Sequence, residues 1–220
     1  MDDSAIGIVL AGGRASRMAG AAPAGKAALR LTATAETFLA RICGTLQQEL
    51  GRVVVVAAAD RPLPPLPRGV TRIHDSAPDA GPLAAVRDGL VWAAAAVSPP
   101  RVAVLCSCDV PLVKPAVVRL LVARLGTAAW VVPRVAGHPQ VLLSAMSLAL
   151  LGPIEAYLSS GRRDPRGLLA AVSADDPARV RELDERDLAV VDPGLMSFRD
   201  VDTPQDLEQL RAEEIPPSAD

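Results

Sequence analysis

A glycine-rich loop with basic residues follows the first apolar run of this 220-residue sequence. The run "IVLAGG" ends in Gly12 and Gly13, and Arg17 and Lys26 come after it. Glycines have no Cβ, so the backbone N–H groups around them can closely approach a triphosphate or a base. Arginine and lysine then supply positive charge to phosphate oxygens. The stretch therefore predicts a phosphate-binding loop at the end of the first strand.

A second kind of phosphate-binding loop overlaps the first. Residues 20–27, "GAAPAGKA", match the spacing G-x-x-x-x-G-K of a P-loop, but Ala27 stands where Ser or Thr would bind magnesium. A P-loop also leaves its strand directly and opens a helix, whereas here about ten residues and a proline intervene. The sequence therefore favours "LAGG" as the binding loop and gives Gly20 only the role of a spacer.

Asp109 is the strongest single candidate for a metal ligand. It follows the apolar run "RVAVLC" and precedes Pro111, which breaks the element. A carboxylate at the carboxyl end of a parallel strand projects into the crevice where such sheets bind ligands, and magnesium prefers oxygen ligands. From position alone, an aspartate that caps a turn is the alternative.

Composition excludes several classes of protein. Half of the residues are apolar and the formal net charge is -2, so a disordered tail is excluded and nothing electrostatic favours nucleic-acid binding. No apolar run reaches the roughly 18 residues of a membrane span, and the acidic N-terminus does not resemble a signal peptide. The length fits one domain, residues 1–220, with a frayed tail at 212–220. We expect a cytoplasmic protein that binds neither nucleic acid nor a membrane.

Cysteines and lysines are both rare. Cys43, Cys106 and Cys108 are too few for a disulfide framework, and no nearby histidine completes a tetrahedral metal set. We therefore expect reduced thiols that pack in the core. Lys26 and Lys114 are the only lysines among 23 basic residues, and both lie close to candidate site motifs. Such a bias suggests that lysine is used where a compact charge on a flexible stem is needed.

Strand-like and helix-like segments alternate along the first part of the chain. Short apolar runs rich in valine or isoleucine predict strands at residues 6–11, 52–58, 70–73 and 101–107. Apolar residues at helical spacing predict helices at residues 37–50, 81–97 and 114–125. This alternation predicts right-handed crossovers and a mainly parallel sheet in a single α/β domain.

The alternation is less regular after Trp130. Strands are expected at residues 128–135 and 138–146, joined by a turn at Gly137. Further strands are expected at 179–186 and 187–192, and helices at 154–159, 166–172 and 203–214. The last helix has good start signals, with Thr203 at the cap, Pro204 in the first turn and Asp206 three residues after the cap.

Four motifs in this order resemble those of the molybdenum cofactor guanylyltransferases and their nucleotidyltransferase relatives. They are "LAGGRASRM…GKAAL", "HDSAPDAGPLAAVRDGL", "VLCSCDVPLV" and "FRDVDTPQDLEQL". The resemblance extends over residues 6–210. It implies a Rossmann-like, three-layer nucleotidyltransferase fold with a mainly parallel, mixed sheet.

The resemblance also implies a reaction. An acceptor phosphate attacks the α-phosphorus of a nucleoside triphosphate and pyrophosphate leaves. The favoured substrates are GTP and molybdopterin carrying its molybdenum, with Mg²⁺ as cofactor and transient contact with a molybdoenzyme or a cofactor-handling protein. A phosphomonoester has a second pKa of about 6 and is already an anion, so no general base is required. Charge neutralisation and in-line placement are what the reaction needs.

Functional roles follow for the matching positions. Nucleotide binding is assigned to Leu10, Ala11, Gly12, Gly13, Lys26, Asp75, Gly81, Pro82 and Asp109. Catalysis is assigned to Arg17, Lys26 and Asp109. Metal binding is assigned to Asp109 and Asp202. Weaker assignments are Asp200 as an alternative ligand, Asp60 as a base contact and His138 as a residue that shapes a hairpin.

Several positions depart from the family pattern and leave alternatives open. Three extra residues precede Lys26, Gly25 replaces an acidic residue, and "DVDTP" carries aspartates where guanylyltransferases have asparagines. The aspartate form is common in cytidylyltransferases for the same pterin, whereas "LAGG" is the guanylyl form. A cytidylyltransferase, another phospho-acceptor nucleotidyltransferase, or a nucleotide-binding chaperone without catalysis are therefore the alternatives.

Overall fold

The computed structural model describes residues 4–12, 18, 20, 22, 24–77 and 80–214. Its centre is a sheet in the order β3-β2-β1-β4-β7-β5-β6, with β8 paired to β5. The strands are β1 (Ala5–Leu10), β2 (Val53–Ala57), β3 (Thr71–His74), β4 (Val102–Ser107), β5 (Trp130–Val135), β6 (His138–Pro139), β7 (Leu143–Ser147) and β8 (Val180–Leu183). The first four are parallel, β7 is antiparallel to both β4 and β5, and β8 is parallel to β5. The expected mixed, mainly parallel sheet is confirmed.

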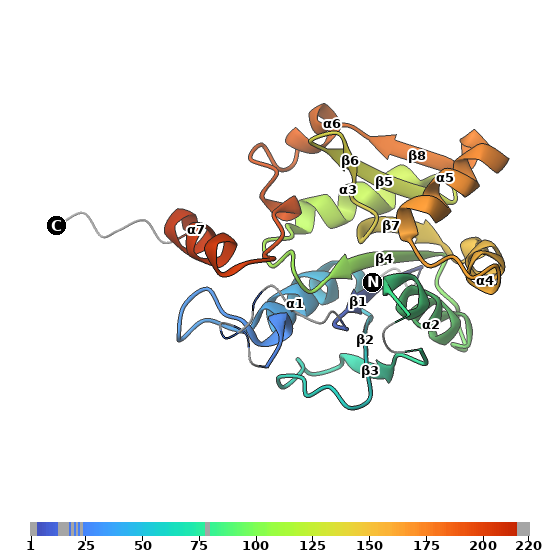
Figure 1. The fold of residues 1–220 in the computed structure, drawn as a ribbon. Coiled ribbons are helices and arrows are strands. Elements are labelled where there is room, and N and C mark those ends of the chain that lie inside the picture. Colours follow the sequence, from blue (N-terminus) through green and yellow to red (C-terminus); the bar gives the residue numbers. More distant parts are fainter. Residues whose placement is uncertain are drawn as a thin grey trace.

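Helices cover both faces of the sheet (Figure 1). They are α1 (Phe38–Leu50), α2 (Pro82–Ala94), α3 (Pro115–Leu125), α4 (Leu151–Ser159), α5 (Pro165–Asp175), α6 (Glu185–Ala189) and α7 (Pro204–Glu214). Buried residues of α1, α3 and α6 pack with one face, on which Val9 lies. Those of α2, α4 and α5 pack with the other, on which Ile8 lies. Successive side chains of a strand point to opposite faces of the sheet, so each central strand contributes side chains to both cores.

The helix α2 lies unusually close to the central strand β1. A β-carbon added at Gly89 would lie only 2.6 Å from Cγ2 of Ile8. The absent side chain at Gly89 therefore allows this approach, and α2 begins at Pro82 after the loop that follows β3.

A third, smaller core joins segments that are far apart in the sequence. Its buried residues are Met18, Leu29, Leu31, Phe38, Leu112, Val201, Leu207 and Leu210. They come from the segment before α1 and the first residue of α1, from the segment after β4, and from α7 and the residues just before it. This core therefore holds together three of the four motifs on which the family resemblance depends.

Two expected strands differ from the structure. Residues 187–192 were expected as a strand, but Glu185–Ala189 form α6, whose first amides are capped by the Asp184 carboxylate at 2.9 Å. Residues 138–146 were expected as one strand but form β6 and β7. Pro139 has no N–H for a ladder, and the pairing of β6 with β5 ends there, whereas β7 pairs with β4 and with β5.

The three cysteines have the environment expected for core thiols. All three are free and buried. Burial raises the pKa of Cys43 and of Cys108 to about 12 and also raises that of Cys106 well above its ordinary value, so all three are protonated thiols. None of the described helices is long and apolar enough to cross a membrane.

Candidate nucleotide and metal site

Three candidate site residues lie where parallel strands end. Gly12 follows β1, Asp75 follows β3 and Asp109 follows β4. The amide of Asp75 continues the ladder by donating to the carbonyl oxygen of Ala57 at 2.9 Å. A β-carbon added at Gly12 would lie 4.0 Å from Oδ2 of Asp75, so the loop glycine faces this carboxylate. The edge is the one at which open α/β sheets bind ligands.

The loop that carries Asp75 is fastened to α2. Oδ1 of Asp75 accepts a hydrogen bond from the amide of Ala77 at 2.9 Å. The next residue, Ser76, donates its amide to Asp88 of α2 at 2.7 Å and contacts the same carboxylate through its hydroxyl at 3.1 Å. Arg87 also donates to Asp88, at 2.6 Å, and its charge offsets that of the carboxylate. These contacts direct Oδ2 of Asp75 toward Gly12.

Lys26 lies between two aspartates, and we call these three residues the Lys26 cluster. Its ammonium lies 3.5 Å from Oδ2 of Asp109 and donates a short hydrogen bond to Oδ1 of Asp202. The Lys26 side chain is only 14% exposed, whereas those of Asp109 and Asp202 are 27% and 34% exposed. Two carboxylates, from the middle and from the C-terminal part of the chain, therefore meet at one cation from its N-terminal part.

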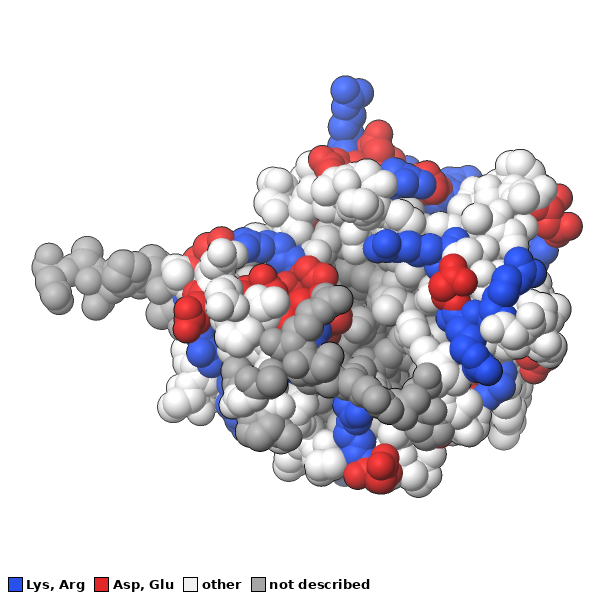
Figure 2. All heavy atoms as spheres, viewed as in Figure 1, with Lys and Arg blue, Asp and Glu red and all other residues white. Residues whose placement is uncertain are grey.

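Charges in this cluster influence one another. Burial alone would lower the pKa of Lys26, but the hydrogen bond to Asp202 and the charges of both aspartates raise it. The pKa of Asp200 is raised by partial burial and by the negative charges of Asp202 and Asp109. Acidic side chains gather on the α7 side of the face shown in Figure 2. The chain thus concentrates negative charge around a single described ammonium.

The two aspartates have a cation between them in the protein alone. Without a bound ion, Asp109 and Asp202 would repel each other and leave the site strained. Instead, the Lys26 ammonium supplies the cation between them. The pair is therefore already compensated in the protein alone.

The residues of the cluster fit a hard divalent ion. Two carboxylates converge on one cation, and carboxylate oxygens are what magnesium prefers. Among the described residues, no three His, Cys, Asp or Glu side chains form a metal-binding group. Magnesium commonly binds through one or two carboxylates and completes its shell with water and substrate phosphates. The cluster thus suits an ion that arrives with a nucleotide.

The P-loop alternative does not agree with the structure. Lys26 begins a 3-10 helix of three residues, Lys26–Ala28, and α1 begins only at Phe38. A P-loop lysine would stand at the start of an α-helix whose N-terminus receives the phosphates. The prediction that "LAGG" is the phosphate-binding loop remains. Two of its assigned residues, Gly13 and Arg17, lie outside the described residues.

A second ion pair was missed by the sequence analysis. Lys114 lies 2.7 Å from Oδ1 of Asp192, whose side chain is completely buried. Ser197 donates its amide to Asp192 at 2.8 Å and accepts the amide of Lys114 at 3.0 Å. Burial opposes ionisation of Asp192, yet the bonds from Lys114 and Ser197 lower its pKa. The rarity of lysine was the only feature of the sequence that pointed to this ion pair.

The remaining assigned residues lie in several elements. Leu10 ends β1 and Ala11 follows it, with its amide bonded to the carbonyl oxygen of Val56 at 2.9 Å. Gly81 and Pro82 form the start of α2. Asp60 lies exposed in the turn after β2, and His138 lies exposed in the short β6.

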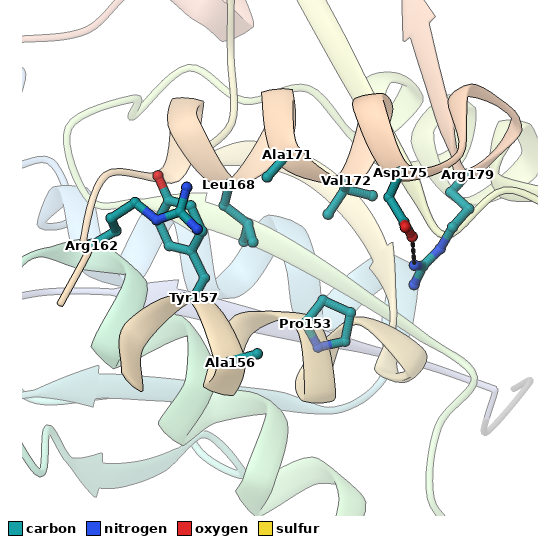
Figure 3. A pocket seen from close by; sticks show the side chains of 9 residues that line it. All are labelled: Pro153, Ala156, Tyr157, Arg162, Leu168, Ala171, Val172, Asp175 and Arg179. Atoms are coloured by element: carbon teal, nitrogen blue, oxygen red, sulfur yellow. Dashed lines mark hydrogen bonds and ion pairs between the residues drawn. The ribbon is translucent and has the colours of Figure 1, made fainter. Parts of the chain in front are cut away.

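One groove lies between α4 and α5 and shares no residue with the predicted site (Figure 3). Its volume is about 310 Å³, and its apolar lining includes Pro153 and Leu168. At one end Arg162 stacks on the ring of Tyr157 at 4.3 Å. At the other end Arg179 pairs with Asp175 at 3.4 Å. The polar side chains at both ends are thus engaged with neighbours.

Comparisons with known proteins show the family of the chain. The three-layer fold places glycine and carboxylates at the carboxyl edge of the parallel strands, where such sheets bind ligands, and a family match gives the class, a nucleotidyltransferase. The family model described as "MobA-like NTP transferase domain" matches residues 7–178. The chain belongs to the MobA-like NTP transferase family.

Named relatives and solved structures resemble the chain over most of its length. A probable molybdenum cofactor guanylyltransferase of Mycobacterium tuberculosis is 34% identical over 186 residues, covering 84% of this chain and 87% of the relative. A molybdenum cofactor guanylyltransferase of Desulfosudis oleivorans is 28% identical and covers 96% of both chains. The structure of molybdopterin-guanine dinucleotide biosynthesis protein A from Archaeoglobus fulgidus superimposes with a TM-score of 0.71 at 21% identity, covering 96% and 97% of the two chains. The expected fold and enzyme class are confirmed.

Proposed function

We propose that the protein transfers GMP from GTP to the terminal phosphate of Mo-molybdopterin, giving the guanine dinucleotide cofactor and pyrophosphate. The observation that carries this proposal is the Lys26 cluster at the ligand-binding edge of the sheet. The names of the relatives supply the substrates. The cytoplasm is the proposed location.

The proposed residues act on charge and geometry. An oxygen of the acceptor phosphate forms a bond to the α-phosphorus of GTP, and the bond from that phosphorus to the bridging oxygen breaks. The acceptor needs no base because its second pKa of about 6 leaves it anionic. Lys26 and Arg17 bind phosphate oxygens, while Leu10, Ala11, Gly12 and Gly13 face the nucleotide with their backbone. Asp75, Gly81 and Pro82 complete the nucleotide site.

Asp109 and Asp202 would hold the divalent ion. The ion, when bound, offsets charge that builds on the leaving pyrophosphate. We propose Mg²⁺. A structural neighbour from Mycobacterium tuberculosis, with a TM-score of 0.62 at 20% identity over 94% of this chain and 97% of the neighbour, is described as a complex with manganese.

The test is a comparison of the four nucleoside triphosphates, each with Mg²⁺ and Mo-molybdopterin. Pyrophosphate release and the dinucleotide product are measured together. We expect GTP to exceed CTP at least about tenfold, because one base-edge interaction of about 1.4 kcal/mol is sufficient. Preference for CTP would favour the cytidylyltransferase. Nucleotide binding without pyrophosphate release would favour the chaperone.

A further inference from the structure

The Lys26 ammonium lies where the carboxylates would hold a divalent ion. Asp109 and Asp202 both contact it, and it is the most deeply buried of the three groups. An ammonium and a metal ion cannot share the space between two carboxylates at contact distance. The same lysine is also the proposed ligand of the triphosphate. The geometry thus gives Lys26 two incompatible sets of partners.

We propose that Lys26 exchanges places with the divalent ion. In the protein alone, Lys26 compensates Asp109 and Asp202. When the ion binds these carboxylates, Lys26 leaves them, and its ammonium becomes the ligand of the triphosphate. The inference rests on the metal site of the proposed function and adds that metal and nucleotide binding are coupled through one side chain.

Charge explains why the exchange favours nucleotide binding. The three side chains together carry one negative formal charge while Lys26 is paired with the aspartates. With a divalent ion added, the same group carries one positive charge, and its ammonium is available on a flexible stem. The two added positive charges therefore make the binding of a polyanion more favourable after the exchange than before it. By linkage, metal and triphosphate must strengthen each other's binding by the same factor.

The first experiment measures Mn²⁺ affinity without nucleotide, by electron paramagnetic resonance of free Mn²⁺. We expect Lys26→Met to bind Mn²⁺ about fivefold or more tightly than the wild type, because the competing ammonium is gone, and to bind GTP with Mn²⁺ more weakly. Lys26→Arg keeps the competing charge and should not gain Mn²⁺ affinity. Equal or weaker Mn²⁺ binding in Lys26→Met would overturn the proposal, as would no measurable binding in either protein.

A matched control removes a cation elsewhere. Arg119 of α3 pairs with Glu49 of α1 at 2.6 Å on the outer helices. Arg119→Met should leave Mn²⁺ affinity unchanged within twofold or so. An equal gain in this variant would mean that net charge, and not the place of Lys26, sets the affinity.

The second experiment uses the wild-type protein and needs no variant to fold. Lys26 and Lys114 are the only lysines of the sequence, so amine acylation followed by mass spectrometry reports each one separately. Lys114 pairs with Asp192 and serves as the internal reference. We expect Mn²⁺ alone to increase the acylation rate of Lys26 relative to Lys114, and GTP added with Mn²⁺ to reduce it again. A Lys26 rate unchanged by saturating Mn²⁺ would refute the exchange.

These measurements separate the inference from the proposed function. Neither of them depends on turnover. A protein that shows the exchange but forms no guanine dinucleotide would retain the inference and lose the function. A protein that forms the product without any change at Lys26 would retain the function and lose the exchange.

Discussion

The amide of Val201 donates a hydrogen bond of 2.9 Å to the carbonyl oxygen of Asp109. This bond fastens the segment that carries Asp200 and Asp202 to the end of β4. The Val201 side chain is 1% exposed and packs in the third core, so the connection is also held by apolar contacts. Backbone atoms and buried side chains thus bring the two carboxylates together, and changes to the carboxylates themselves should leave the backbone in place.

Replacing the two aspartates should therefore affect catalysis far more than folding. We expect Asp109→Asn to reduce turnover at normal Mg²⁺ by about 100-fold or more, because charge stabilisation at the reacting phosphates is lost. Asp202→Asn should cost about tenfold or less, since an asparagine oxygen can still bind the ion. Pyrophosphate release gives the rates, and the melting temperature checks the fold. A wild-type rate for Asp109→Asn would exclude it as the metal ligand.

Substitutions in the loop distinguish Lys26 from Gly20. Lys26→Ala should weaken GTP binding by about 1.5–3 kcal/mol, the range for charged hydrogen bonds. Gly20 has a φ of +85°, with nothing within 4 Å of an added β-carbon, so Gly20→Ala introduces backbone strain but no clash. It should lower stability by about 1–2 kcal/mol and change GTP affinity only a few-fold. Calorimetric titration with GTP measures the affinity of both variants. Loss of GTP binding in Gly20→Ala would show that this glycine belongs to the phosphate-binding loop.

The cap of α7 should be coupled to the site through Asp206. Its Oδ2 accepts the amides of Thr203 at 2.6 Å and of Asp202 at 3.0 Å. The hydroxyl of Thr203 accepts the amide of Asp206 at 3.2 Å, which completes the expected capping box. Asp206→Ala and Thr203→Ala should each lower the free energy of unfolding by about 1 kcal/mol. Only Asp206→Ala should also reduce Mn²⁺ affinity, because it releases the backbone of Asp202. Equal Mn²⁺ affinity in both variants would contradict this coupling.

The ion pair between Lys114 and the buried Asp192 should make stability depend on pH. Lys114→Met should lower the free energy of unfolding at neutral pH by about 1–3 kcal/mol, because a buried acceptor loses its cation. The folded-state pKa of Asp192 is lowered from 3.8, so this stabilisation is complete above that value and is lost as the pH falls through the folded-state pKa.

The test is urea unfolding of both proteins at about pH 7 and about pH 3. The difference between wild type and Lys114→Met should shrink at the lower pH. Arg119→Met, which breaks an ion pair with a 61% exposed arginine, should cost less than about 1 kcal/mol. A difference that stays constant with pH would show that Asp192 does not depend on Lys114.

Local patterns in the sequence were sufficient for most elements of the fold. The four early strands and the helices α1, α2 and α3 follow from apolar spacing, which depends only on neighbouring residues. Parallel strands end at one edge, so the positions of Gly12, Asp75 and Asp109 could be predicted from the motifs that follow those strands. Residues 187–192 were misjudged because a short apolar run does not distinguish strand from helix, and the capping role of Asp184 was not used.

By itself, the sequence indicated the family, the order of most strands and helices, and the edge of the sheet at which the candidate site lies. Only the tertiary structure decided that the Lys26 ammonium lies between Asp109 and Asp202, and that Asp192 is buried against Lys114. These relationships join segments far apart in the chain, and their distances depend on packing in the third core and on the Val201 bond. Periodicity and motif spacing carry no information on such distances, because side chains meet there only after the separate segments have packed together.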